Sequence, residues 1–143
     1  MNKLIYEKIK KYEKPGDFTH SLVTDEMITQ TETALGIKLP EQYIEFLKNF
    51  GHGGIGGIEM LGVGLTGRMI FADETINYRD EGLPTKLVVI ENVDEWLECI
   101  DCNTGKIVSW DFSGYIKEDY DCFEDYLNDQ MDNAIDNMEV LDN

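Results

Sequence analysis

The sequence lacks any long apolar run. None of its hydrophobic stretches approaches the roughly 18–20 residues that a helix needs to cross a bilayer. In the N-terminal stretch MNKLIYEKIKKYEK, charged residues interrupt every apolar segment, so it has no hydrophobic region typical of a signal peptide. We therefore expect a cytoplasmic protein, made in the cytosol and retained there.

Cysteine is scarce as well. Cys99, Cys102 and Cys122 are an odd number in a chain with no expected export signal, which favours reduced thiols. The Cys99-x-x-Cys102 spacing matches zinc and redox motifs, but in a strand it would place the two thiols on opposite faces. Beyond carboxylates, only Cys122, His20 and His52 remain as further zinc ligands. We expect no metal site, and we expect no catalytic thiol because nothing ties a histidine to a cysteine.

Basic residues are few, with 12 Lys and Arg against 29 Asp and Glu and a net charge of −17. Residues 91–143 hold 16 of the acids and two lysines, which gives this part a net charge of −14. Such a field repels nucleic acid and anionic lipid, so neither is an expected partner. It attracts cations such as calcium, a basic peptide or a basic protein, although an acidic surface also simply aids solubility. No DxDxDG calcium loop occurs.

What is present is the composition of one ordinary globular domain. With 143 residues, 42% of them hydrophobic, the chain can bury a core without a disulfide or metal. Apolar residues at helical spacing predict a helix over residues 3–13. A second helix is predicted between an N-cap at Thr24 and a glycine stop at Gly36. A third opens at Pro40, as a first-turn proline, and closes at Gly51.

Beyond the third helix the apolar pattern changes. Four β-prone segments follow, at residues 58–63, 87–93, 97–101 and 107–112. The sequence Asn103-Thr104-Gly105 predicts a hairpin turn between the last two, which makes the sheet mainly antiparallel. Residues 64–86 carry several glycines, a proline and weak periodicity, which predicts mostly loop.

The last predicted element is a C-terminal amphipathic helix. Asp121 and Glu124 form a candidate cap pair at its start. Its apolar stripe consists of Phe123, Tyr126, Leu127, Met131, Ala134, Ile135 and Met138. N-terminal helices, a central sheet and a final helix predict a single α+β domain over residues 1–143.

Two glycine clusters, beginning at Gly51 and Gly62, match the dinucleotide-binding pattern GxGxxG. That motif binds phosphates only where a strand ends and a helix begins. The first match follows a predicted helix, and the second leads into a segment with poor helical periodicity. We expect no nucleotide and no other cofactor, and we interpret the glycines as sharp turns of the chain.

The stretch LGIKLPEQYIEFLKNFGHGG, residues 35–54, carries a more specific pattern. Five of its residues, followed by the glycine pair Gly53-Gly54, resemble the hallmark of the SUKH (Smi/Knr-like) superfamily: Leu39, Pro40, Tyr43, Phe46 and Leu47. One departure is His52, where many members have asparagine. Downstream, LVVIENVDEWLECID and GKIVSWDF resemble the family's central strands and its tryptophan-aspartate strand end at Trp110. The resemblance covers about residues 24–130.

The resemblance implies an α+β protein that binds another protein and is not an enzyme. Many bacterial members are immunity proteins that neutralise polymorphic toxin domains, often nucleases, and small acidic members of the YobK type accompany LXG toxins. It thus implies an antitoxin that occludes the active cleft of a cognate toxin. A regulatory scaffold related to cell-wall synthesis regulators is the alternative. The motif residues, with Gly53, Gly54 and Trp110, are implied to be structural.

We expect the toxin to bind the acidic C-terminal half. Nucleases attract a polyanion, so their clefts are basic, and an acidic inhibitor is steered toward them. Trp96 is a candidate apolar anchor within that charged surface. The predicted partner-binding residues are Glu91, Asp94, Glu95, Trp96, Glu98, Asp101 and Asp111.

Overall fold

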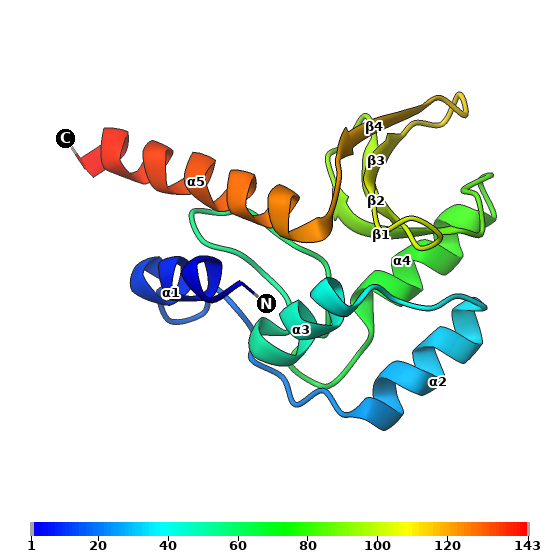
Figure 1. The fold of residues 1–143 in the computed structure, drawn as a ribbon, viewed down its shortest axis with the longest axis horizontal. Helices are drawn as coiled ribbons and strands as arrows, with labels where there is room; N and C mark the ends of the chain where they lie inside the picture. Colours follow the sequence, from blue (N-terminus) through cyan, green and yellow to red (C-terminus); the bar gives the residue numbers. More distant parts are fainter. Residues whose placement is uncertain (1, 143) are drawn as a thin grey trace.

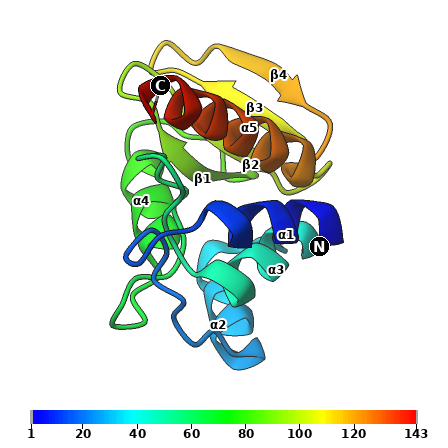
Figure 2. The ribbon, with the colours of Figure 1, turned by 90° about the vertical axis from the view of Figure 1, so that its left-hand side faces the viewer.

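The structure, a computed structural model, describes residues 2–142 and the side chains of residues 2–138. In chain order its elements are α1 (Lys3–Tyr12), α2 (Asp25–Leu35), α3 (Glu41–Phe50), α4 (Ile70–Arg79), β1 (Leu87–Asn92), β2 (Leu97–Asp101), β3 (Ile107–Trp110), β4 (Ile116–Tyr120) and α5 (Phe123–Asp142). The strands form one antiparallel sheet in the order β1-β2-β3-β4. The sheet is strongly curved, with α5 beside it, while α1, α2 and α3 lie below (Figures 1 and 2). The predicted α+β fold is confirmed.

The first three helices begin and end within one residue of the predicted bounds. Thr24 caps α2, because its Oγ1 accepts a hydrogen bond from the Met27 N–H at 3.1 Å. Gly36 ends α2 in the left-handed region, with φ of 71°. Pro40, expected inside the third helix, is instead its N-cap with extended φ and ψ of −61° and 144°, and α3 begins at Glu41.

The core is richest in aromatic rings where α3, α4 and α5 meet. The Tyr43 ring centroid lies 5.3 Å from that of Phe71 and 5.2 Å from that of Phe123. Phe46 lies 5.6 Å from Phe123, and all four side chains are at most 1% exposed. The Tyr43 hydroxyl donates to the Leu61 carbonyl at 2.6 Å, so its polar atom has a partner inside the core.

Residues 58–63, predicted as a strand, do not join the sheet. The segment makes only isolated bridges, from Met60 to Gly53 and from Val63 to Met69, and a single hydrogen bond from the Leu61 N–H to the β1 carbonyl of Ile90. Most of its other backbone partners are in the glycine-rich loop after α3, for example Gly51 for the Val63 N–H, and the Gly62 carbonyl accepts from the Phe71 N–H of α4 at 3.3 Å. Met60, Leu61 and Val63 are buried like strand residues, but their segment pairs with a loop and not with another strand.

The prediction of loop over residues 64–86 is wrong for ten residues, which form α4. The buried face of this helix consists of Phe71, Ala72 and Thr75. Because Thr75 is polar, the sequence shows no regular helical spacing of apolar residues here. The Thr75 Oγ1 donates to the Phe71 carbonyl and accepts from the Val89 N–H of β1 at 3.0 Å. A side chain of α4 thus satisfies a backbone donor on the edge of the sheet.

The start of α5 also differs from the prediction. The Glu124 N–H donates to the Gln42 side-chain oxygen of α3 at 3.0 Å, so this cap comes from a neighbouring helix rather than from Asp121. The Asn2 N–H in turn donates to the Glu124 carboxylate at 2.7 Å. These contacts join α1, α3 and α5 at one end of the molecule.

Candidate partner-binding site

Two turns meet at one end of the sheet. Leu97 of β2 pairs with Trp110 of β3, which pairs with Ile116 of β4, so the β1–β2 and β3–β4 turns are neighbours. The Asp111 Oδ1 caps the β3–β4 turn by accepting from the Ser113 N–H at 2.9 Å. The Ser113 hydroxyl and the Tyr115 N–H donate to the same oxygen, so three hydrogen bonds order this turn.

Side chains from these turns and the adjoining strands enclose a hollow of about 350 Å³. We call it the acidic hollow, and its lining residues are Trp96, Glu98, Ser109, Asp111, Tyr115, Lys117 and Asp119. Trp96 and Tyr115 are 38% and 62% exposed, so two aromatic rings are available at the surface. Three carboxylates and one lysine make the hollow negative overall.

Glu98 is the most buried residue of the acidic hollow, with 8% of its surface exposed. Its Oε1 accepts hydrogen bonds from Trp96 Nε1 and Ser109 Oγ, each at 2.9 Å, whereas its Oε2 is buried and has no partner within the described part of the chain. Ser109 also contacts the carboxylate of Asp119. Burial raises the pKa of Glu98 to about 7, and the charge of Asp119 acts in the same direction.

The seven predicted partner-binding residues do not lie together: five are in or beside the acidic hollow, and two are elsewhere. Trp96, Glu98 and Asp111 line the acidic hollow, and Asp94 and Glu95 lie exposed on the adjacent turn. Glu91 and Asp101 lie elsewhere, and both have internal partners.

Glu91 faces the C-terminal helix, because the Tyr126 hydroxyl donates to its carboxylate. Asp101 is 8% exposed and lies at the other end of β2, where it accepts from the Asn103 N–H at 2.9 Å and pairs with Lys86 at 3.4 Å. Neither carboxylate contributes to the acidic hollow, and Glu98, though part of it, offers little open surface.

Four residues of the acidic hollow were not predicted: Ser109, Tyr115, Lys117 and Asp119. Three of them follow Trp110, in the turn and the strand β4, which has no apolar alternation to signal a strand. Antiparallel pairing of the segments on either side of Ser113-Gly114 would have found them, because Ser109 then stands opposite Lys117.

The motif residues are internal rather than exposed. Tyr43, Phe46 and Leu47 are fully buried, and Trp110 is 2% exposed. The glycine pair is needed for space: a Cβ at Gly53 would lie 2.0 Å from the Asp17 carbonyl oxygen, and one at Gly54 would lie 2.4 Å from the Ile58 carbonyl oxygen. Backbone segments pass too closely here for any larger residue.

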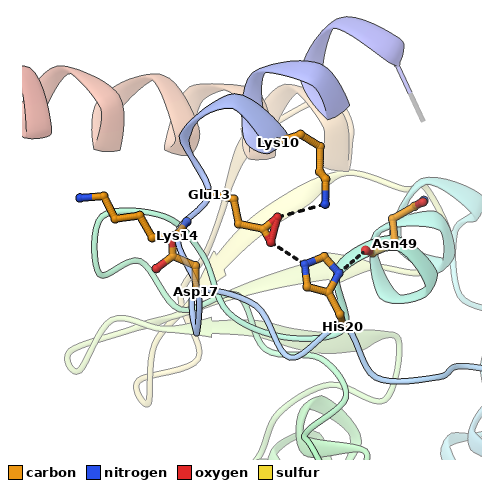
Figure 3. Close-up of polar contacts among 6 residues, drawn as sticks. All are labelled: Lys10, Glu13, Lys14, Asp17, His20 and Asn49. Atoms are coloured by element: carbon orange, nitrogen blue, oxygen red, sulfur yellow. Dashed lines mark hydrogen bonds and ion pairs between the residues drawn. The ribbon is translucent and has the colours of Figure 1, made fainter.

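A second polar cluster ties the end of α1 to α3 (Figure 3). The His20 ring lies between the Asn49 carbonyl, 3.0 Å from Nδ1, and the Glu13 carboxylate at Nε2. Lys10 adds a contact to Glu13 at 3.2 Å, while the Lys14 side chain points away. Both His20 partners are acceptors, so both contacts are satisfied only when the ring carries two protons. The cluster is explained by its role in holding α1.

The thiols are poor candidates for chemistry. Burial raises the pKa of Cys102 to about 12, helped by the Asp101 charge, and burial also raises the pKa of Cys99. Thiols in this state are weak nucleophiles and ligands at neutral pH. Across the part of the chain that the structure describes, no group of three His, Cys, Asp or Glu side chains is placed to hold a metal ion. Within the same residues, no helix combines the length and the apolarity that a membrane span requires.

Residues 1–132 match the model of the family SUKH_5, described as SMI1-KNR4 cell-wall. The chain belongs to the SUKH superfamily. SUKH members are generally non-enzymatic immunity proteins, and the family points to a protein as the partner. The fully buried Tyr43, Phe46 and Leu47 lie within the matched region.

A similar fold is found in a solved structure. The chain is similar to a protein from Pseudomonas syringae pv. tomato, with a TM-score of 0.66 and 19% sequence identity. The match covers 80% of this chain and 87% of that one. At this identity the likeness concerns the fold and not the site.

Proposed function

We propose that this SUKH protein is an immunity protein that binds a cognate toxin domain and neutralises it by occluding a basic active cleft, as in a nuclease. The observation that carries the proposal is the uncompensated charge of residues 91–143. Of their 16 acids, four pair with a lysine in the part of the chain that the structure describes: Asp101, Glu118, Asp119 and Asp132.

Uncompensated charge supports the proposal because a nuclease cleft is basic. Complementary potentials speed the encounter of two proteins and disfavour wrong partners. The exposed Trp96 and Tyr115 add the aromatic contact area in which interface hot spots are enriched. A cytoplasmic location belongs to the same proposal, because such an inhibitor must meet the toxin where the toxin acts.

Co-expression tests the proposal. The C-terminal domain encoded by the gene next to this one is expressed from an inducible promoter, with and without this chain. Rescue of growth, together with co-purification of the two proteins, is the expected result. If the neighbouring domain is toxic and this chain neither rescues growth nor binds it, the proposal is wrong for that pair.

A regulatory scaffold is the second candidate, and the description of the matched family as cell-wall favours it. The two candidates differ in a strain that carries no toxin gene. Deleting the gene for an immunity protein leaves cell shape and sensitivity to wall-active antibiotics unchanged there, whereas deleting a regulator alters them.

A further inference from the structure

The acidic hollow has fewer hydrogen-bond donors than its carboxylates require. Ser109 has one hydroxyl hydrogen, yet its Oγ contacts both Glu98 and Asp119. Lys117 lies 3.4 Å from Asp119 and 64% of its side chain is exposed, so it neutralises only one side of the pair. Among the residues that the structure describes, none gives the buried Glu98 Oε2 a hydrogen bond. A buried carboxylate oxygen without a hydrogen bond destabilises the fold, so a donor from a partner could fill this vacancy favourably.

The surroundings of this vacancy favour a flat, positively charged group. Trp96 and Tyr115 line the same hollow and are partly exposed. Aromatic faces attract cations, and guanidinium groups stack on them. Asp111 adds a third carboxylate to the lining.

We propose that the acidic hollow binds the guanidinium of an arginine from the partner protein, which pairs with Glu98 and packs against Trp96 and Tyr115. The proposal rests on the proposed function, because it names the contact that a basic toxin domain would make. Arginine fits better than lysine because its planar fork delivers several donors at once to carboxylates. The volume of about 350 Å³ is at the lower end of ligand pockets, which suits one side chain.

The charge state of Glu98 supplies a second signature of binding. Burial and Asp119 raise its pKa to about 7, so a bound cation, which favours the carboxylate, displaces a proton. Affinity should then rise with pH through neutrality. The other titratable or charged groups that face Glu98 come from β1, β4 and α5, namely Glu91, Lys117, Asp119, Tyr120 and Tyr126.

The test is a titration of the ¹⁵N-labelled full chain with the blocked peptide acetyl-Gly-Arg-Gly-amide, followed by NMR. The Trp96 indole N–H, which donates to Glu98, is the reporter, and the Trp110 indole is the internal control because it points to the other face of the sheet. With the arginine peptide we expect the Trp96 signal to shift and to reach saturation. The lysine peptide should bind with lower affinity. The citrulline peptide, which has the shape of arginine without its charge, should cause no shift. Equal responses to arginine and citrulline, or no response, would overturn the proposal.

Variants locate the site. Glu98→Gln should lower the affinity for the arginine peptide about tenfold or more, because a hydrogen bond to a charged group is lost. Tyr115→Ala, at a residue 62% exposed and therefore safe for folding, should weaken it less. Glu118→Gln is the control, because it makes the same substitution on β4, opposite Val108 and outside the hollow. Equal affinities for Glu98→Gln and wild type would contradict the assignment.

The two proposals fail separately. If wild type rescues cells from the toxin and Glu98→Gln rescues them equally well, the arginine site is wrong and the immunity function stands. If the arginine peptide binds as expected and wild type fails to rescue, the site stands as a guanidinium receptor and the toxin assignment is wrong.

Discussion

Phe46 packs at the centre of the aromatic cluster and is fully buried. Its ring lies within 6.3 Å of those of Phe18, Tyr43, Phe50 and Phe123. Truncation leaves a cavity that four rings from three parts of the chain cannot fill by moving together. At the residue scale, this side chain contributes to stability and has no surface to offer a partner.

Phe46→Ala should lower the free energy of unfolding by roughly 3–5 kcal/mol, measured by urea denaturation. Glu41→Ala, an exposed position on the same helix, is the control and should change it by under about 1 kcal/mol. A Phe46→Ala variant that unfolds like wild type but fails to bind would show that the residue has a different role.

The raised pKa of Glu98 predicts that the stability of the protein depends on pH. Its pKa is raised from 4.5 to about 7 by burial, so its favourable contribution to stability is complete below pH 4.5 and is lost as pH rises through about 7. Glu98→Gln cannot ionise, and should therefore gain stability relative to wild type between pH 5 and pH 8. The upper limit of the gain is roughly 3–4 kcal/mol, because the pKa rises from 4.5 to about 7 and each pKa unit corresponds to roughly 1.4 kcal/mol.

Urea denaturation at several pH values measures that gain. Glu118→Gln, at an exposed carboxylate, is the control and is measured over the same pH range. A difference between Glu98→Gln and wild type that does not change with pH would contradict the raised pKa of Glu98.

At the scale of elements, α1 is attached to the molecule by its side chains. Lys8 reaches α5, where its Nζ lies 2.7 Å from Asp132 and 2.7 Å from the Asn128 side-chain oxygen. Glu13, just after the helix, contacts His20, which also contacts the Asn49 carbonyl at the end of α3. Helix α1 is thereby joined to α5 and to the end of α3 through polar contacts.

Replacing His20 should loosen α1. His20→Asn is the suitable change, because His20 has a φ of 49° that asparagine tolerates, and asparagine is too short to reach Glu13. Burial raises the pKa of Glu13, but hydrogen bonds from His20 and Lys10 outweigh it and hold the pKa below 4.5. Its contribution is therefore present above pH 4.5 and lost as pH falls through the lowered value.

We expect His20→Asn to lose about 1 kcal/mol at neutral pH and to show a smaller loss of stability on acidification. Amide hydrogen exchange should quicken in α1 and stay unchanged in the sheet. Lys14→Gln is the control, since that side chain points away from the cluster (Figure 3). Unchanged exchange in α1 would mean that Lys8 and the buried Ile5 and Ile9 suffice to hold the helix.

At the scale of the whole molecule, the net charge of −17 opposes folding through self-repulsion. Salt screens this repulsion, with a Debye length that falls from about 30 Å at 0.01 M to 10 Å at 0.1 M. The melting temperature should therefore rise with NaCl over this range.

A charge-reversed variant separates screening from other effects of salt. Glu95→Lys combined with Asp136→Lys, both at exposed positions, should melt higher than wild type in low salt and respond less to NaCl. Glu95→Gln with Asp136→Asn should lie between the two. If all three proteins respond equally to NaCl, self-repulsion is not the cause.

Local signals predicted most of the helices and the central strands. Thr24, Gly36 and the Asn103-Thr104-Gly105 turn act through their own backbone geometry, so neighbours far along the chain do not alter them. The apolar period of residues 41–50 and the motif residues predicted the inner face of α3 for the same reason, because a helix side is set by spacing alone.

The wrong or missing predictions depend on distant partners. Residues 58–63 look like a strand, but their backbone pairs with the loop at residues 51–53. Helix α4 buries Thr75, whose hydroxyl accepts a hydrogen bond from β1, so its apolar period is incomplete. Strand β4 is polar and lies at the edge of the sheet, where it pairs with β3 alone. Backbone groups can find hydrogen-bond partners anywhere in the fold, and the spacing of apolar residues does not show which partners they find.

The charge of the C-terminal half was determined by the sequence, but its arrangement was not. Composition alone predicts the negative field, since charge is summed over residues whatever the fold. Only the tertiary structure turned Glu91 toward Tyr126 and Asp101 toward Lys86, and placed Glu98 beside Asp119. Which acids meet depends on the strand register, and the register is decided when β4 pairs with β3.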